Sequence, residues 1–321
     1  MRVVFMGSAD VSCVMLAVLL KADDCEIVGV VTQPDRPCGR NRQLTPCPAK
    51  RLAVEAGLPV ATPEKINAPE ALAQVTAWAP DVGVVVAYGQ FLGRRLLDLP
   101  SHGCVNIHFS LLPRHRGAAP VQWAIASGDT ETGVTAMRMD AGMDSGDILG
   151  QTREPILPED TAGSLSERLA AIGARLQIQT LRDLADGRAV RAPQDAAQAT
   201  FAPKLRKEDG AIDWTQPAAV IERRVRAFNP WPGSFTGLPR RLHAGHADAH
   251  IKVLHVSVTP FEATGVPAPP GTVLDCAGDG PLVQTGAGAL RLLVVQPEGR
   301  KAMSAQAFLC GHPLQAGARF E

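Results

Sequence analysis

The chain has 321 residues, enough for two ordinary domains that each bury a core. Its composition, 45% hydrophobic and 20% charged, is that of a folded globular protein and excludes a disordered or fibrous chain. The formal net charge is zero, so any binding of nucleic acid must come from local basic patches.

The spacing of the cysteines and the length of the apolar runs indicate the cellular compartment of the protein. The seven cysteines are scattered, with no C-x-x-C spacing, which is typical of reduced thiols and argues against a disulfide framework or a zinc knuckle. The longest nearly apolar run, residues 11–20, is too short to span a bilayer. The N-terminal sequence MRVVFMGSAD leads directly into a strand pattern, so we expect no cleaved leader. These features predict a cytoplasmic protein.

The first half of the chain alternates strand patterns with helical patterns. The strands are apolar on both faces, as buried parallel strands are, and are predicted at residues 3–6, 27–32, 82–87 and 105–107. Helices are predicted at residues 12–21, 49–56 and 69–78, and after residue 116. Two more strands, at 135–139 and 148–149, and a long helix at 165–184 follow. This alternation predicts a doubly wound, mostly parallel α/β sheet of Rossmann-like type.

The composition changes after residue 190. Residues 191–207 contain prolines, alanines and charges without sustained periodicity, so we predict a linker between a catalytic domain at 1–190 and a second domain at 208–321. In the second domain, one helix at 218–228 precedes short strands that turn residues separate. This spacing predicts a smaller C-terminal β-barrel of oligonucleotide-binding type.

The stretch CVNIHFSLLPRHRGAAP, residues 104–120, places two polar side chains on a buried strand. Because alternate residues of a strand share a face, Asn106 and His108 project together, at the strand end where α/β sheets bind ligands. An amide can donate to a developing oxyanion, and an imidazole can transfer a proton near neutral pH. Either residue alone could be a satisfied core residue. Together, at a strand end, they favour a site.

A glycine-rich acidic loop, MDAGMDSGDIL at residues 139–149, supplies a third candidate. It carries Asp140, Asp144 and Asp147 near the end of a strand, and their spacing does not match that of a calcium loop. At least two of these aspartates are adequately explained as solvated loop residues. A carboxylate that faces an imidazole would raise the pKa of the imidazole and keep it protonated.

These two motifs resemble those of the 10-formyltetrahydrofolate-dependent formyltransferases, whose strand carries Asn-x-His before S-L-L-P. The segments TQPDRPCGR, VVVAYGQ, RAFNPWPGSF and GRKAMSAQ extend the resemblance, in order, over nearly the whole chain. They are most similar to the members of the family that act on methionyl-tRNA. The resemblance implies transfer of a formyl group from the co-substrate 10-formyltetrahydrofolate to the α-amino group of methionyl-initiator tRNA for translation initiation. It implies no metal, membrane or obligate protein partner.

Carried over residue by residue, the resemblance implies catalytic roles for Asn106, His108 and Asp144. Asn106 and a protonated His108 would stabilise the tetrahedral oxyanion, and Asp144 would keep His108 protonated and help to move the amine proton. The sequence FMGSAD after the first strand lacks the G-x-G-x-x-G that a dinucleotide would require.

The resemblance also implies that the turn after the strand forms part of the folate pocket, through Ser110, Leu111, Leu112 and Pro113. The loop near Tyr88 would contact the pterin. Phe109 departs from the pattern of the family, in which a small residue is usual at this position. Strand alternation is expected to send its side chain away from the Asn106–His108 face. Its effect on the formyl pocket is left open.

Three arginines, Arg36, Arg40 and Arg42, occupy PDRPCGRNRQ, which is predicted as a long loop. The resemblance implies that Arg40 and Arg42 contact the acceptor stem of the tRNA. A solvated basic loop is an equally good interpretation of the sequence alone.

Further basic clusters could form a discontinuous track for RNA, at residues 204–207, 223–226 and 240–241. The histidines His243, His246 and His250 have the spacing of one helix face. Their neighbourhood reads as turn and strand, however, which disfavours a metal site.

Two other functions compete with this interpretation. The first is formylation of a small amine, such as glycinamide ribonucleotide or an amino sugar, and a C-terminal β domain with basic patches argues against it. The second is a catalytically idle RNA-binding protein on the same fold, and the presence of all three candidate catalytic residues argues against that. The oligomeric state and the basis of tRNA identity are left open.

Overall fold

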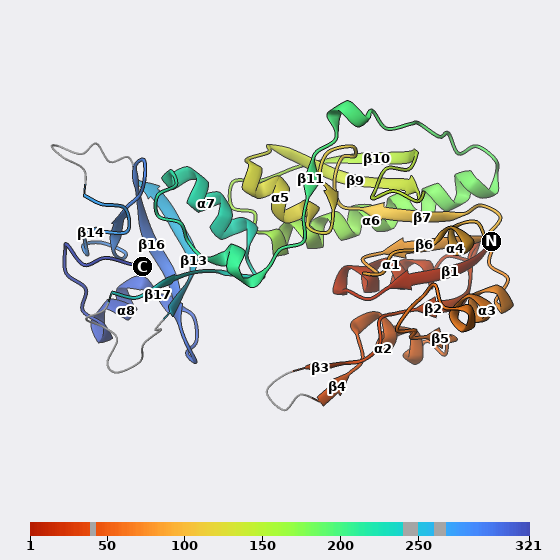
Figure 1. The fold of residues 1–321 in the computed structure, drawn as a ribbon, viewed down its shortest axis with the longest axis horizontal. Helices are drawn as coiled ribbons and strands as arrows, with labels where there is room; N and C mark the ends of the chain where they lie inside the picture. Colours follow the sequence, from red (N-terminus) through yellow and green to blue (C-terminus); the bar gives the residue numbers. More distant parts are fainter. Residues whose placement is uncertain (39–42, 240–249, 260–267) are drawn as a thin grey trace. The chain divides into compact units, whose positions relative to one another are not determined.

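The computed structural model describes residues 1–38, 43–239, 250–259 and 268–321 (Figure 1). The chain divides into two compact units, each of which takes in separate segments. The first unit comprises residues 1–120, 131–155 and 165–203. The second unit comprises residues 121–130, 156–164 and 204–321. In the described part of the chain, no helix is long and apolar enough to cross a membrane.

A seven-stranded sheet forms the centre of the first unit, in the order β10-β9-β7-β6-β1-β2-β5. The strands are β1 (Arg2–Gly7), β2 (Glu26–Val31), β5 (Val60–Ala61), β6 (Val82–Val86), β7 (Cys104–His108), β9 (Glu131–Arg138) and β10 (Ile148–Pro155). The five from β5 to β7 pair in parallel, whereas β9 and β10 pair antiparallel at one edge. The carboxyl ends of the parallel strands therefore lie along one edge of the sheet.

Helices connect these strands. The predicted helices are present, with ends that differ by up to three residues, and the structure adds a short helix at residues 94–97 that the sequence did not predict. The helices are α1 (Asp10–Leu19), α2 (Pro48–Glu55), α3 (Pro69–Ala77), α4 (Arg94–Leu97), α5 (Pro120–Ser127) and α6 (Ala162–Ala185). Helix α6 packs closely on the sheet at Gly173, where a Cβ would lie 2.6 Å from Met15 and 3.1 Å from Ile107. Ile107 thus faces α6 from β7, and the residues on either side of it point to the opposite face.

Two segments differ from their predicted character. The segment predicted as a long loop forms an antiparallel hairpin of β3 (Arg36–Cys38) and β4 (Gln43–Thr45). The segment predicted as a linker begins within the first unit: β11 (Phe201–Ala202) pairs in parallel with β8 (Arg116–Gly117), and a 3₁₀ turn, η1 (Ala196–Gln198), precedes it. Such short two-residue pairings leave no periodicity for sequence patterns to detect.

The second unit is built on an antiparallel sheet with strand order β12-β13-β16-β15-β14, to which β17 adds by pairing with β16. Its elements are η2 (Lys207–Gly210), α7 (Ala218–Ala227), β12 (Ser234–Gly237), β13 (His250–Thr259), β14 (Val273–Asp275), β15 (Leu282–Gln284), β16 (Ala289–Pro297), β17 (Met303–Ser304) and α8 (Ala305–Gly311). One apolar cluster, which includes Trp214, Ile221 and Phe308, forms its core. The predicted fold class, a mostly parallel α/β sheet with a smaller β unit, is confirmed.

Candidate active site

The end of β7 carries the two polar side chains of the Asn-x-His motif. Strand β7 lies between β6 and β9, and residues 106 and 108 pair with Met137 and Thr135 of β9. His108 is buried, with 6% of its surface exposed, whereas Asn106 is half-buried. The motif therefore stands at the carboxyl edge of the parallel part of the sheet.

Asp144 meets both side chains from the loop between β9 and β10. Its Oδ1 lies 3.4 Å from Nδ2 of Asn106, and its Oδ2 lies 3.7 Å from Nδ1 of His108. The backbone N–H of Gly117 donates to Oδ2 at 2.8 Å, which fixes the carboxylate. The structure thus brings together the three residues that the sequence nominates as catalytic.

The hydrogen bonding of His108 identifies its tautomer. Its Nε2 lies 2.9 Å from the backbone carbonyl oxygen of His115. Because a carbonyl oxygen only accepts hydrogen bonds, Nε2 carries the proton and donates it. In the neutral ring Nδ1 is then an unprotonated acceptor, and it is the nitrogen that faces Asp144.

Burial dominates the electrostatics of this imidazole. Removal from water lowers the pKa of His108 below its ordinary value of 6.5, against smaller upward contributions from the Asp144 carboxylate and the His115 carbonyl. The Asp144 carboxylate raises the pKa of His108, as expected, but at 3.7 Å this increase is smaller than the decrease that burial causes. In the free protein His108 is therefore mainly neutral at pH 7, in contrast to the expected protonated form.

The other two aspartates of the acidic loop serve the loop itself. Asp140 accepts hydrogen bonds from the backbone N–H of Gly142 and the hydroxyl of Ser145, both at 2.9 Å. The backbone carbonyl of Asp147 accepts a hydrogen bond from the backbone N–H of Arg138 at 2.8 Å. Asp144 itself has φ of +49°, a conformation that residues other than glycine adopt only under constraint. The loop is thus closed in a way that presents Asp144 to His108.

The turn after β7 is tied to the neighbouring strands. The Ser110 hydroxyl donates to the carbonyl of Arg114 at 2.6 Å, and the carbonyl of Ser110 accepts from the Thr135 hydroxyl at 2.6 Å. The carbonyl of Leu112 accepts from Nε2 of Gln151 at 2.8 Å. Ser110 and Leu112 are buried, whereas Leu111 and Pro113 remain partly exposed. Contact with a bound folate would thus fall mainly on the latter two, which stays a prediction.

Two aromatic residues near this edge are buried. Phe109 is 9% exposed and Tyr88 is 2% exposed. Tyr88 packs in the apolar cluster that includes Val4 and Met6, while its backbone carbonyl accepts from Nε2 of Gln33 at 3.1 Å. The contact of the Tyr88 loop with a pterin remains a prediction.

Comparison with known proteins identifies the family to which the chain belongs. A family model described as formyl transferase matches residues 1–181, and one described as formyl transferase, C-terminal domain, matches residues 204–313. The chain belongs to the formyl transferase family. This membership confirms the resemblance that the Asn-x-His motif and the acidic loop indicate.

Similar members of the formyl transferase family match over almost their entire length. The chain is 45% identical over 319 residues to methionyl-tRNA formyltransferase of Geobacter metallireducens, covering 99% of this chain and 98% of the relative. It is also 45% identical over 318 residues to the methionyl-tRNA formyltransferase of Myxococcus xanthus, covering 99% and 97%. The crystal structure of WlaRD, a sugar 3N-formyl transferase, shares the fold with a TM-score of 0.64 at 15% identity, covering 94% of this chain and 99% of that one.

The basic residues considered for contact with tRNA fall into four groups. Arg40 and Arg42 lie outside the described residues, as does the pair at 240–241. Arg36, in β3, pairs with the exposed Glu64 at 3.3 Å. In the cluster at 204–207, the charged residues Lys204, Arg206 and Lys207 are all exposed.

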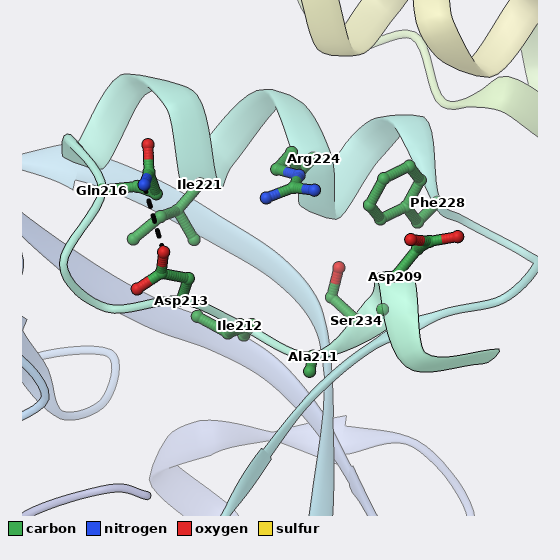
Figure 2. Close-up of a pocket in the computed structure, with 10 residues that line it drawn as sticks. Asp209, Ala211, Ile212, Asp213, Gln216, Ile221, Arg224, Phe228 and Ser234 are labelled. Atoms are coloured by element: carbon green, nitrogen blue, oxygen red, sulfur yellow. Dashed lines mark hydrogen bonds between the residues drawn. The ribbon is translucent and has the colours of Figure 1, made fainter. Parts of the chain in front are cut away.

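The arginine cluster at 223–226 is more engaged in the structure of its own unit. The Arg226 side chain pairs with Glu222 and donates to the carbonyl of Asp160 at 3.0 Å. The Arg224 guanidinium lies 5.5 Å from the ring centroid of Phe228 and lines a small pocket with Asp209 and Asp213 (Figure 2). Of the two described clusters, residues 204–207 therefore offer the more accessible positive charge.

Two of the three histidines with helical spacing, His243 and His246, lie outside the described residues. His250 begins β13, with its ring 5.5 Å from that of Phe235. Within the described ranges, no group of three His, Cys, Asp or Glu side chains could hold a metal ion. The sequence interpretation missed the roles of two backbone groups, the carbonyl of His115 and the N–H of Gly117, because backbone partners leave no mark on residue type.

Proposed function

We propose that this protein transfers the formyl group of 10-formyltetrahydrofolate to the α-amino group of methionyl-initiator tRNA, in the cytoplasm. The observation that carries the proposal is the meeting of Asn106, His108 and Asp144 at the carboxyl edge of the sheet. Support for the substrate comes from relatives named methionyl-tRNA formyltransferase, which the chain matches at about 45% identity over 99% of its length. No metal has a role in this proposal.

Asn106 stabilises the oxygen of the formyl group in the proposed reaction. Its amide nitrogen carries two N–H donors, and the 3.4 Å contact with Asp144 is too long to commit either of them firmly. A donor can therefore turn to the formyl oxygen as the amine attacks and negative charge develops there. Donors placed in this way typically accelerate acyl transfer by about 100- to 1000-fold.

His108 moves the proton. As the amine nitrogen bonds to the formyl carbon, the carbonyl electron pair moves to oxygen and the nitrogen becomes a cation. The lone pair on Nδ1 of His108 accepts the proton that this nitrogen releases. The imidazolium, flanked by Asp144 and the carbonyl of His115, then protonates the folate nitrogen as its bond to the formyl carbon breaks, and the carbonyl re-forms.

Asp144 stabilises the charged intermediate of this cycle. Its Oδ2 is held by the N–H of Gly117 and faces Nδ1 of His108, so the attraction between them strengthens when the ring is protonated. The neutral ring of the free protein is thus ready to act as a base. Protonation is transient here, whereas the sequence-based interpretation had Asp144 keep the ring protonated throughout.

The second unit and the segment at 39–42 are proposed to hold the tRNA. The exposed charges at 204–207 suit contact with RNA phosphates, and Arg40 and Arg42 would contact the acceptor stem. With one tyrosine and 4% aromatic residues in the chain, base stacking is a minor contribution, and shape and phosphate contacts would dominate.

The proposal is tested by following a labelled formyl group from 10-formyltetrahydrofolate. We expect the label to appear on methionyl-initiator tRNA and to be absent when the amine is blocked by acetylation or when the tRNA is uncharged. Glycinamide ribonucleotide and a nucleotide-linked amino sugar serve as alternative acceptors. A preference for either small amine over methionyl-tRNA would replace the proposed function, and label on none of the acceptors would reject it.

A further inference from the structure

Residues 192–202, near the end of the first unit, contact the loop that carries Asp144. The amide nitrogen of Gln194 donates to the backbone carbonyls of Asp144 at 2.9 Å and of Gly146 at 2.8 Å. Its amide oxygen accepts from Nε and a terminal nitrogen of Arg116, at 3.1 and 2.8 Å. A backbone bridge between Ala192 and Ile148 anchors the segment beside these contacts. One half-buried side chain thus joins the acidic loop to the turn that follows β7.

The same segment holds the other partner of the imidazole. The hydroxyl of Thr200 accepts from the backbone N–H of His115 at 2.8 Å, and β11 continues the contact by pairing with β8. His115 has φ of +58°, so its carbonyl is directed at His108 from a constrained conformation. Residues 192–202 therefore hold in place both groups that flank the ring, Asp144 and the His115 carbonyl.

We propose that Gln194 is a positioning residue for formyl transfer, which by bridging Arg116 to the carbonyls of Asp144 and Gly146 holds the carboxylate of Asp144 against His108. This inference rests on the proposed function for its kinetic consequence only. Its structural consequence, the placement of Asp144 beside the imidazole, can be measured without any substrate.

The chemistry of the bridge requires an amide. The end of the side chain that faces two carbonyl oxygens must donate hydrogen bonds. The end that faces the guanidinium of Arg116 must accept them, and only an amide does both. Glutamate keeps the length and the contact with Arg116 but places a carboxylate oxygen against two carbonyl oxygens. Because Asp144 has positive φ, loss of the bridge lets the loop relax from a constrained conformation and withdraw the carboxylate.

Kinetics of Gln194→Ala and Gln194→Glu test the proposal. Both substitutions are expected to lower kcat by about 100-fold, the usual effect of a small misplacement of a reacting group, and to leave KM for both substrates within about twofold. The matched control is Gln198→Ala, four residues away in the same segment, where the exposed side chain hydrogen-bonds only Asp195 among the described residues. The control is expected to match the wild type.

A second readout follows His108 itself by NMR titration of histidine side chains, with His108→Asn to assign its signal. The titratable groups that act on this ring are Asp144, which raises its pKa, and His115, which lowers it. Withdrawal of Asp144 should lower the pKa of His108 further in both Gln194 variants and leave it unchanged in Gln198→Ala. A purely structural role for Gln194 would lower thermal stability without this change.

The outcomes separate the inference from the proposed function. A wild type without formyl transfer, together with a lowered His108 pKa in the Gln194 variants, rejects the function and keeps the positioning role. Wild-type kcat in Gln194→Glu, or an unchanged His108 titration in folded variants, overturns the positioning role. If the Gln194 variants do not fold, Arg116→Lys, which removes the guanidinium that holds the amide oxygen of Gln194, is titrated instead. An unchanged His108 pKa there overturns the proposal equally.

Discussion

The Nε2 atom of His108 donates to the backbone carbonyl of His115 at 2.9 Å, which directs the opposite ring nitrogen at Asp144. The ring is thus held by a neutral acceptor on one side and faces a carboxylate 3.7 Å away on the other. This arrangement leaves a buried imidazole whose unprotonated Nδ1 faces the carboxylate of Asp144.

The pKa of His108 gives the unfolding free energy a specific dependence on pH. Burial holds the folded-state pKa below the unfolded value of about 6.5, so the unfolded chain binds the proton more readily. The contribution of His108 to the free energy of unfolding is therefore complete above pH 6.5, and it is lost as the pH falls through the folded-state pKa. Denaturant unfolding of the wild type and His108→Gln between pH 5 and 8 should show their difference in stability shrinking towards acid. A difference that grows towards acid would show a raised pKa.

Gly146 closes the acidic loop where no side chain fits. A Cβ there would lie 1.7 Å from the backbone carbonyl oxygen of Arg138, so Gly146→Ala must displace the loop and Asp144 with it. We expect a fall in kcat of at least 100-fold, measured by formyl transfer at saturating substrates. Gly142→Ala is the control in the same loop, because the nearest atom to its Cβ would be the rotatable hydroxyl of Ser145, at 2.1 Å. Equal activity of the two variants would contradict this account of the loop.

The sequence predicted the parallel sheet and its helices because their apolar patterns are long and regular. Alternation along β7 also pointed to Asn106 and His108. The glycine-rich loop offered three aspartates, among which the resemblance to the formyltransferases implied Asp144. The partners of these residues could not be predicted in the same way. The His115 carbonyl and the Gly117 N–H are backbone groups, and Gln194 lies 50 residues from Asp144 in a segment without periodicity. The hairpin of β3 and β4 was missed because each strand has only three residues.

We expect Arg40 to affect the binding of tRNA and not the formyl-transfer step. Arg40→Ala should raise KM for methionyl-tRNA, leave folate binding unchanged, and reduce the slope of binding against log salt by about one unit for each phosphate that the side chain no longer neutralises. Arg36→Ala is the matched control in β3, where the guanidinium already pairs with Glu64. The measurement is a titration of labelled methionyl-tRNA at several salt concentrations. Equal KM values and salt slopes for the two variants would assign Arg40 to solvated surface.

The exposed charges at residues 204–207 of the second unit lead to a separate prediction. Replacing Lys204 and Lys207 together by alanine should weaken tRNA binding and lower the salt slope by about two units, with kcat at saturating tRNA unchanged. Lys21→Ala removes an equally exposed charge after α1 and should have no effect on either quantity. Both variants are compared by filter binding across a salt series. If the double variant binds as the wild type does, tRNA contact would have to be sought at other residues.

In the proposed reaction, the site at the end of β7 stabilises the transition state of formyl transfer to methionyl-tRNA. The most direct measurement is the single-turnover rate of Asn106→Ala, with the enzyme in excess over labelled methionyl-initiator tRNA and saturated with 10-formyltetrahydrofolate. The account predicts a rate lower by about 100- to 1000-fold, with tRNA and folate dissociation constants close to those of the wild type, because the hydrogen bond that Asn106 supplies forms only in the transition state. A single-turnover rate within a few-fold of the wild type would contradict it.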